Sequence, residues 1–437
     1  MLGLGIAIVF ACYILKNVNS PAKVLFAQFC FMLFSQALIS ILGAPSFIMY
    51  LGDLCNIIVL LHLIYQNRLF YIRKSMLNIM ICILLFFLIG IITAITNSVK
   101  IYLIIWSLRN YLRFIIFTVA VVAYWKNIYT IKIINNLFPL LVINMLVSFF
   151  QYFQHVYSPD WIGGLLGNCY GVNAYSLMLF MFSSAYYIDS FINKKEKVYK
   201  VLLALISIFS CVIIADLKVF YFIFIVETVV ILIQNRMGMR TILLFIIGSI
   251  SAVMIYFVCL SLYNSQNIFD INYIMYYLTE SSYSYSTTSI NRTDGISIIN
   301  RVFGFTKDEQ LFGLGLGAGE YNSYFSSDIY SRYGDMHYIW FLYAWMYLET
   351  GIVGLVLFFL MLTFLLIYIW RNKGKNATSF QKIACSMLVA AYILTFYSSS
   401  LRGDSAYIFY AFIGIAIKEC LERRNQCEMA KFKNEIF

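Results

Sequence analysis

Long apolar runs separated by short polar segments dominate this chain. Runs of about 17 to 25 apolar residues match the hydrocarbon thickness of a membrane, and backbone at that depth must satisfy its own hydrogen bonds, which favours helices. The pattern predicts an all-α, polytopic integral membrane protein with about 12 to 13 transmembrane helices. The expected spans are residues 1–15, 24–42, 46–65, 77–95, 101–125, 128–153, 172–192, 199–215, 217–234, 241–262, 338–369, 383–400 and 405–418.

One polar segment, residues 263–337, is far longer than the others. It spans about 75 residues rich in Ser, Tyr and Asn, and loops of this length are usually functional or disordered. The stretch "GISIINRVFGF" has helical periodicity, and "LFGLGLGAGEYNSYF" is rich in turn-forming residues. We expect a folded cap of short helices on a single integral membrane domain, 1–437. A second loop, "QHVYSPDWIGGLLGNCYGVNAYS", can pack beside this cap.

The distribution of charge supports the membrane assignment and orients the expected bundle. The chain is 62% hydrophobic and only 12% charged, outside the range of soluble globular proteins. Lys and Arg cluster in every second loop, and such clusters are retained on the cytoplasmic side. Residues 263–337 are then expected at the outer face. The net charge of +11 reflects this topology and the anionic inner leaflet; it does not indicate nucleic-acid binding. The clusters are Lys16/Lys23, Arg68/Arg73/Lys74, Lys126/Lys132, Lys194/Lys195/Lys197/Lys200, Arg236/Arg240, Arg371/Lys373/Lys375/Lys382 and Lys418/Arg423/Arg424/Lys431/Lys433.

The remaining cations fall where this topology disfavours them, so each needs a physical reason. A charge at membrane depth costs at least about 2.5 kcal/mol unless it is paired or faces water. Structural ion pairs, such as Asp216 with Lys218, are one explanation. The other is an outer cavity whose guanidinium groups bind a diphosphate bidentately. These cations are Lys100, Arg109, Arg113, Lys218, Arg292, Arg301, Lys307, Arg332 and Arg402.

Glycines and one histidine complete the candidate chemistry. Gly315 and Gly317 belong to an alternating glycine series that permits backbone conformations closed to other residues, as a mere tight turn also would. His337 precedes the apolar run that contains Glu349 and Gly351. Its imidazole suits a general base acting on a sugar hydroxyl, or an interfacial anchor of the helix end. We interpret Glu349 as a buried structural acid, and Gly351 as a site of close helix approach.

Three features follow one another along the chain: Arg292, the stretch "GLGLGAGEY", and His337 at the start of "HYIWFLYAWMYLETGIVGLVLFF". Their order resembles that of the Wzy-type O-antigen polymerase and ligase superfamily. The segment "GLLGNCYGVNAYSLML" also resembles a stretch of that family. The chain departs from the family in having Tyr338 where Asn is usual, and Lys218 in "ADLKVF" where Ser-x-Arg is common.

The resemblance implies a glycosyltransferase of the bacterial inner membrane that polymerises O-antigen or capsule repeat units at the outer face. It would join undecaprenyl-diphosphate-linked oligosaccharides, without a cofactor or a metal ion. His337 would activate the acceptor hydroxyl, and Gly315 and Gly317 would form the loop turn. The residues expected to bind diphosphate or glycan are Arg292, Arg301, Lys218, Arg402, Arg109 and Arg113.

The resemblance also implies partners and leaves two alternatives open. The lipid bilayer and the lipid-linked oligosaccharides are the expected partners, together with a chain-length regulator and a flippase of the same pathway. One alternative is an O-antigen ligase of the same superfamily, which transfers finished glycan to another acceptor. The other is a polysaccharide flippase or exporter, for which cations spread through a central cavity and short loops are expected.

Overall fold

The computed structural model describes residues 2–68, 76–155, 158–235, 290–322, 324–373 and 377–436. Within these ranges the chain is helical and has no strand beyond one isolated bridge, Tyr321 to Ser326. Each expected span that falls on described residues coincides with a helix, whereas 241–262 lies outside them. The long helices are α1 (Leu2–Lys16), α2 (Pro21–Ser40), α3 (Leu51–Tyr65), α4 (Leu77–Thr96), α5 (Ile101–Tyr124), α6 (Asn127–Phe153), α7 (Val172–Ile192), α8 (Val198–Ile214), α9 (Val219–Gln234), α15 (Leu342–Asn372), α16 (Ser379–Tyr397) and α17 (Ala406–Ile436).

Length and hydropathy identify the helices that can cross a membrane. Among the described residues, seven segments qualify: α2, α3 with the 3-10 turn before it (Ser46–Tyr65), α4, α5, α6, α15 and α16. Three shorter helices, α1, α8 and α9, are also apolar. The protein is therefore an all-α, polytopic membrane protein, as the sequence predicts.

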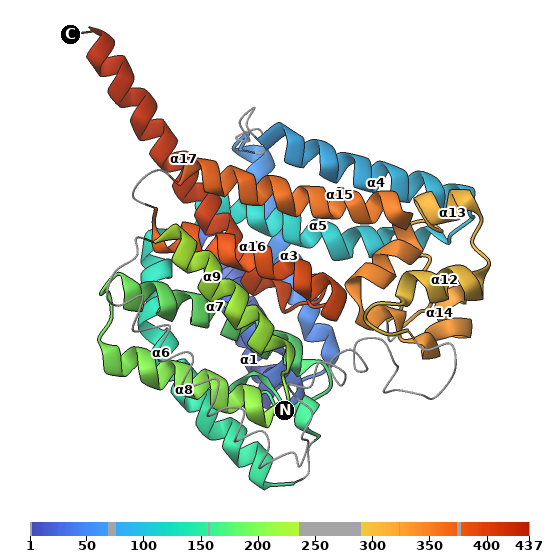
Figure 1. Ribbon diagram of the computed structural model, residues 1–437, viewed down its shortest axis with the longest axis horizontal. Coiled ribbons are helices and arrows are strands. Elements are labelled where there is room, and N and C mark those ends of the chain that lie inside the picture. Colours follow the sequence, from blue (N-terminus) through green and yellow to red (C-terminus); the bar gives the residue numbers. More distant parts are fainter. Residues whose placement is uncertain are drawn as a thin grey trace.

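The loops lie at two ends of the bundle. At one end Asn97, after α4, donates to the carbonyl oxygen of Leu314 (3.1 Å); at the other Arg68, after α3, donates to that of Ala123 near the end of α5 (3.0 Å). We call the end that holds residues 158–171, 290–341 and 398–405 the cap end, and the opposite end the basic end. Figure 1 shows α12 (Gly295–Phe303), α13 (Lys307–Phe312) and α14 (Asp328–Tyr333) gathered at the cap end, while α17 projects away from the body. At the basic end, Lys195 and Lys382 both lie beside Asp189, with Nζ to Oδ distances of 3.4 and 3.2 Å.

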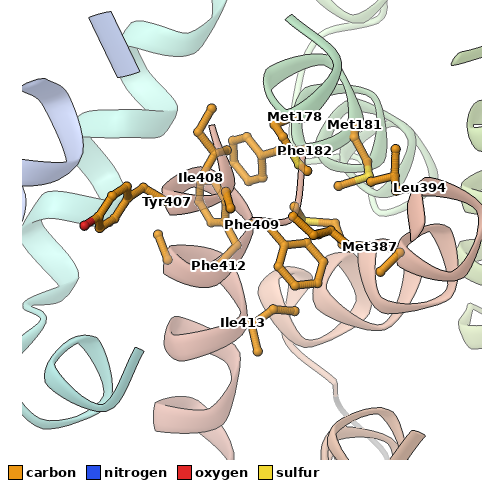
Figure 2. Packing of buried hydrophobic residues seen from close by; sticks show 14 of the residues in the cluster. Met178, Met181, Phe182, Met387, Leu394, Tyr407, Ile408, Phe409, Phe412 and Ile413 are labelled. Atoms are coloured by element: carbon orange, nitrogen blue, oxygen red, sulfur yellow. The ribbon is translucent and has the colours of Figure 1, made fainter. Parts of the chain in front are cut away.

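Helix α7 occupies the centre of the bundle and is buried along almost all of its length. It contacts α8, α9, α16 and α17. The rings of Phe182 and Phe412 stack with centroids 3.5 Å apart. Buried hydroxyls on α7 bond within the helix, as Ser183 does to the Leu179 carbonyl oxygen (2.7 Å). Figure 2 shows this packing around Met178, Met181, Phe182, Met387, Leu394, Ile408, Phe409 and Phe412.

The described part of the expected cap, residues 290–337, forms three short helices, and 263–289 lies outside the described residues. Helix α12 coincides with the periodic stretch "GISIINRVF" and ends at Gly304 with φ +60°. Helix α13 begins with a capping box, in which Thr306 Oγ1 accepts from Glu309 N (3.3 Å) and Glu309 Oε2 accepts from Thr306 N (2.7 Å). Local sequence signals therefore determine where these cap helices begin and end.

Helix α15 is interrupted at Gly351, where φ is +62° and ψ is −165°. The carbonyl oxygens of Leu348 and Glu349, one turn before the break, accept hydrogen bonds from Leu314 N (2.9 Å) and Gly315 N (2.8 Å). The expected span began at residue 338, but residues 338–340 form a separate 3-10 turn. Gly351 was expected to admit a neighbouring helix, and a Cβ there would indeed meet the backbone of Leu311 in the cap helix α13.

Candidate functional site

The Gly-rich segment is buried against the cap-end turns of the bundle. Gly315 and Gly317 have φ of +99° and +91°, a region that favours glycine. A Cβ on Gly315 would collide with the backbone of Ala94 on α4, and one on Gly317 would lie 2.6 Å from Leu103 on α5. The segment therefore needs glycine for both conformation and space. It packs against Ala94 near the end of α4 and Leu103 near the start of α5.

A buried ion cluster holds this segment in place. The guanidinium of Arg402, in the loop between α16 and α17, pairs with Glu320 and lies 3.1 Å from Glu349 Oε2. It also donates to Ser107 Oγ on α5 (3.0 Å). Burial acts to lower the pKa of Arg402, but the two glutamates outweigh it, and the pKa is raised. The positive charge of Arg402 is thus committed to two internal carboxylates.

Arg109 and Arg113 lie on one face of α5, as their spacing predicts, and both are also paired. Arg113 forms an ion pair with Asp404, and its Nη2 donates to the carbonyl oxygen of Arg402 (2.9 Å). Arg109 Nε donates to Asp53 (2.9 Å). The structure places both arginines in ion pairs, which the sequence offered as one of two explanations for such cations.

The acids that pair with these arginines could not be identified as partners from sequence spacing. Each of these acids is far along the chain from the arginine that it pairs with, and only the folded bundle brings the two together. The pairs are Arg109 with Asp53, Arg113 with Asp404 and Arg402 with Glu320. The sequence does indicate that these arginines need either an acidic partner or a polar cavity, because each lies in or next to an apolar run. The structural explanation holds for Arg109, Arg113 and Arg402.

A cavity of about 460 Å³ opens beside His337 at the cap end. His337 lies between two 3-10 turns and has φ +59°, an uncommon conformation for a residue with a side chain. Such conformations cluster at functional sites. The cavity is lined by Tyr170, Tyr321, Ser326, Tyr330, Ser331, Arg332, Gly334, Asp335, His337, Ile339 and Trp340.

The environment of the His337 imidazole favours its neutral form. Its Nδ1 is buried and has no hydrogen-bond partner among the described residues. Burial lowers the pKa of His337, because it disfavours the cation, and nearby Asp335 acts in the opposite direction. The ring packs on Trp340, with centroids 3.9 Å apart. A neutral imidazole with a free nitrogen at a cavity wall has the properties of a general base.

Aromatic rings form much of the cavity wall. Tyr170, from the loop before α7, packs near Trp340 (centroids 6.0 Å apart), so the second loop does lie beside the cap. Tyr321 and Tyr330 stack with centroids 4.2 Å apart. Amphipathic rings with hydroxyl groups offer both apolar faces and hydrogen bonds to a sugar.

Tyr338, where the resembling family usually has Asn, is a structural residue here. Its side chain is fully buried, and its hydroxyl donates to the carbonyl oxygen of Gly319 (3.1 Å). This bond ties the residue after His337 to the Gly-rich segment. Burial raises the pKa of the Tyr338 hydroxyl, so the phenol stays neutral.

Arg292 and Lys218 belong to a second group of charges at the cap end. The Arg292 guanidinium carbon lies 5.0 Å from the ring centre of Tyr397 on α16 and 5.8 Å from that of Phe341. Lys218 Nζ is 3.1 Å from Asp216, which is the ion pair that the sequence offered as an explanation for this lysine. Lys218 keeps about a third of its side chain exposed (32%), so it remains accessible.

Asp160 connects these two cations electrostatically. Burial raises its pKa, Asp216 raises it further, and Lys218 and Arg292 lower it. Asn173 of α7 donates to Asp160 Oδ1 (3.1 Å). Both Asp160 and Asn173 fall in the second loop, residues 154–176, although neither was expected to contribute to the site.

Arg292 and His337 lie on two segments of the chain that are hydrogen-bonded to each other. Ile290 N donates to the carbonyl oxygen of Met336 (3.0 Å), which joins the residues just before each of them. Tyr343 of α15 donates from its hydroxyl to the carbonyl oxygen of Asn291 (2.8 Å) and fixes the same stretch. The described structure thus brings the base candidate and one cation candidate together at a single end of the bundle.

Other candidate residues lie apart from this arrangement. Arg301 is exposed in the last turn of α12. Within the described ranges, no three His, Cys, Asp or Glu side chains gather in a way that could hold a metal ion.

Comparisons with known proteins do not identify a family. No protein-family model matches this chain, and no curated protein matches it.

Proposed function

We propose that this protein is a polysaccharide polymerase, a glycosyltransferase that joins lipid-diphosphate-linked oligosaccharide repeats into O-antigen or capsule. The proposal rests on one observation above all. His337 lines a cavity of about 460 Å³ with aromatic and hydroxyl walls, and its buried Nδ1 has no hydrogen-bond partner among the described residues. The backbone next to His337 is hydrogen-bonded to the segment that carries Arg292.

In the proposed reaction, the acceptor sugar of one repeat lies in the cavity with its hydroxyl at His337. The imidazole takes the hydroxyl proton while the oxygen attacks the anomeric carbon of the donor repeat. A glycosidic bond forms, the bond from that carbon to the diphosphate breaks, and polyprenyl diphosphate leaves. The proton passes from the imidazole to water, which restores the base.

Arg292 and Lys218 are the proposed diphosphate ligands. A planar guanidinium matches phosphate oxygens bidentately, and a lysine adds a point charge. Tyr397 and Phe341 flank Arg292 and limit its conformations. Arg402, Arg109 and Arg113 contribute indirectly, because their ion pairs fix the Gly-rich segment and the loops next to it.

The proposed location is the bacterial inner membrane, with the cap end at the outer face and undecaprenyl diphosphate as the lipid carrier. The basic end then faces the cytoplasm, in accord with retention of Lys and Arg on that side.

The glycan length distribution of a deletion strain tests the proposal. Loss of a polymerase leaves one repeat on each lipid acceptor. Full-length chains that remain unattached would indicate a ligase, and the absence of any outer-face glycan would indicate a flippase; either result would overturn the proposal. Restoring the wild-type gene must return the normal length distribution.

A further inference from the structure

Arg332 lines the same cavity as His337, and no acidic side chain among the described residues pairs with it. It lies in the last turn of α14 and is exposed. Asp328, four residues earlier on the same helix, would be its natural partner. Asp328 instead forms an ion pair with Lys100, whose Nζ lies 3.0 Å from Asp328 Oδ1. Among the described residues, no acidic group lies within ion-pair distance of Arg332.

Asp335 is the other charged residue that lines the cavity, and its carboxylate interacts electrostatically with the imidazole of His337. The carboxylate favours the protonated imidazole, as expected for a neighbouring acid. No ion pair joins Asp335 to Arg332 in the described part of the chain. In the proposed reaction Asp335 stabilises the imidazolium that forms when His337 takes a proton. Arg332 is then a cation without an acidic partner among the described residues, and it lines the proposed sugar site.

We propose that the acceptor repeat carries an acidic sugar, with a carboxylate that Arg332 binds while the ring of the sugar packs on the aromatic wall. This inference rests on the proposed function and narrows it to a substrate class, a glycan that contains a uronic acid. A guanidinium fork matches a carboxylate bidentately, and such charge-assisted bonds are stronger than neutral ones. An uncompensated arginine at the wall also rejects a cationic amino sugar.

The position of Arg332 favours a role in selection over one in chemistry. His337 and Arg332 line one cavity, so a sugar bound there can contact both side chains. Tyr321 and Tyr330 stack between the Gly-rich segment and α14 and support this wall. Removal of the guanidinium should therefore weaken binding of acidic sugar while the base remains in place.

Binding of simple sugars to the purified full-length protein in detergent tests the inference. The probes are methyl glycosides of glucuronic, galacturonic and mannuronic acid, each compared with its neutral hexose by saturation-transfer NMR. We expect at least one uronic acid to bind about ten-fold or more tightly than its neutral counterpart. Arg332→Gln should abolish that preference, and added salt should weaken it. Lys307→Gln, which removes an exposed cation outside the cavity, should leave the preference intact.

Two kinds of result would overturn the inference. The first leaves the proposed function standing, and the second refutes it as well. If neutral and acidic sugars bind the wild type equally, or if Arg332→Gln keeps the preference, selection by Arg332 is refuted while the polymerase proposal stands. If no sugar of either kind binds the wild type, the cavity is not a glycan site and the proposed function fails with it.

Discussion

Arg402 and Glu320 form a fully buried ion pair that joins the loop between α16 and α17 to the Gly-rich segment. Glu349 of α15 shares the same guanidinium, so one cation serves two buried carboxylates. The rings of Trp345 and Tyr111 lie over the guanidinium at 3.7 and 4.5 Å. The cap is thereby attached to helices α5, α15 and α17 through charge as well as packing.

Arg402→Met should destabilise the protein by about 3 to 5 kcal/mol, because it leaves buried carboxylates without a cation. The measurement is the temperature at which the detergent-solubilised protein loses its monodisperse elution peak. Glu320→Gln, which leaves Glu349 to pair with Arg402, should cost less. An Arg402→Met protein with wild-type stability and no activity would instead make Arg402 a substrate ligand.

Gly315→Ala should destabilise the cap by several kcal/mol, since its Cβ collides with the Ala94 backbone and its φ is +99°. Gly304→Ala is the matched control. Gly304 also has positive φ, +60°, but a Cβ there meets nothing within 4 Å. It should cost only about 1 kcal/mol, the strain of the left-handed backbone. The same thermal assay compares them, and equal losses would refute the close fit of the Gly-rich segment.

Arg292→Lys should abolish most polymer formation while the protein accumulates normally. The substitution keeps the charge but replaces a planar fork with a point charge, and it removes the stacking on Tyr397. Lys307→Ala is the control, because Lys307 is exposed on α13 beside Asp308 and Glu309. Glycan ladders from complemented deletion strains provide the readout. Normal ladders from Arg292→Lys would remove Arg292 from the diphosphate site.

The two ends of the bundle should face opposite sides of the membrane, with the cap end outside. Tyr324 is 66% exposed in the cap, and Lys194 is exposed at the basic end. In a variant that carries Cys169→Ser, a membrane-impermeant thiol reagent should label Tyr324→Cys in intact spheroplasts. It should label Lys194→Cys only after permeabilisation. The reverse pattern would invert the proposed orientation.

The sequence predicts the helices well because membrane burial imposes a simple apolar pattern on each one. It predicts the cap helices too, since Thr306 with Glu309 is a local start signal and Gly304 a local stop signal. The break at Gly351 escapes such reasoning, because the apolar run continues through it. Its cause is the distant Gly-rich segment, which takes up the carbonyl groups of the preceding turn.

The candidate site is predictable only in part, for a related reason. The position of His337 at a polar boundary and its order after Arg292 are visible in the sequence. Its left-handed backbone and its free Nδ1 depend on packing against Trp340 and on the turn that begins at Gly334. Arginine partners depend on contacts between distant helices, which charge spacing along one helix does not specify.

If His337 acts as the base, the rate of the reaction must depend on the protonation state of its imidazole. Burial lowers the pKa of His337 below its ordinary value of 6.5. The neutral, active form therefore predominates at pH 7, and the rate should fall only as the pH drops through that lowered pKa. Two variants complete the test. His337→Gln keeps a hydrogen-bonding side chain, and His337→Asn also suits the left-handed backbone.

The decisive measurement is the polymerisation rate of the purified wild type and the two variants between pH 5 and 8. The substrate is a lipid-diphosphate-linked repeat isolated from the deletion strain, and glycan ladders report the product. We expect both variants to fold, to lose about 10² to 10⁴ in rate, and no longer to show the acidic decline that His337 causes in the wild type. Wild-type rates and an unchanged pH profile in either variant would exclude His337 as the base and leave it as an anchor of the cap.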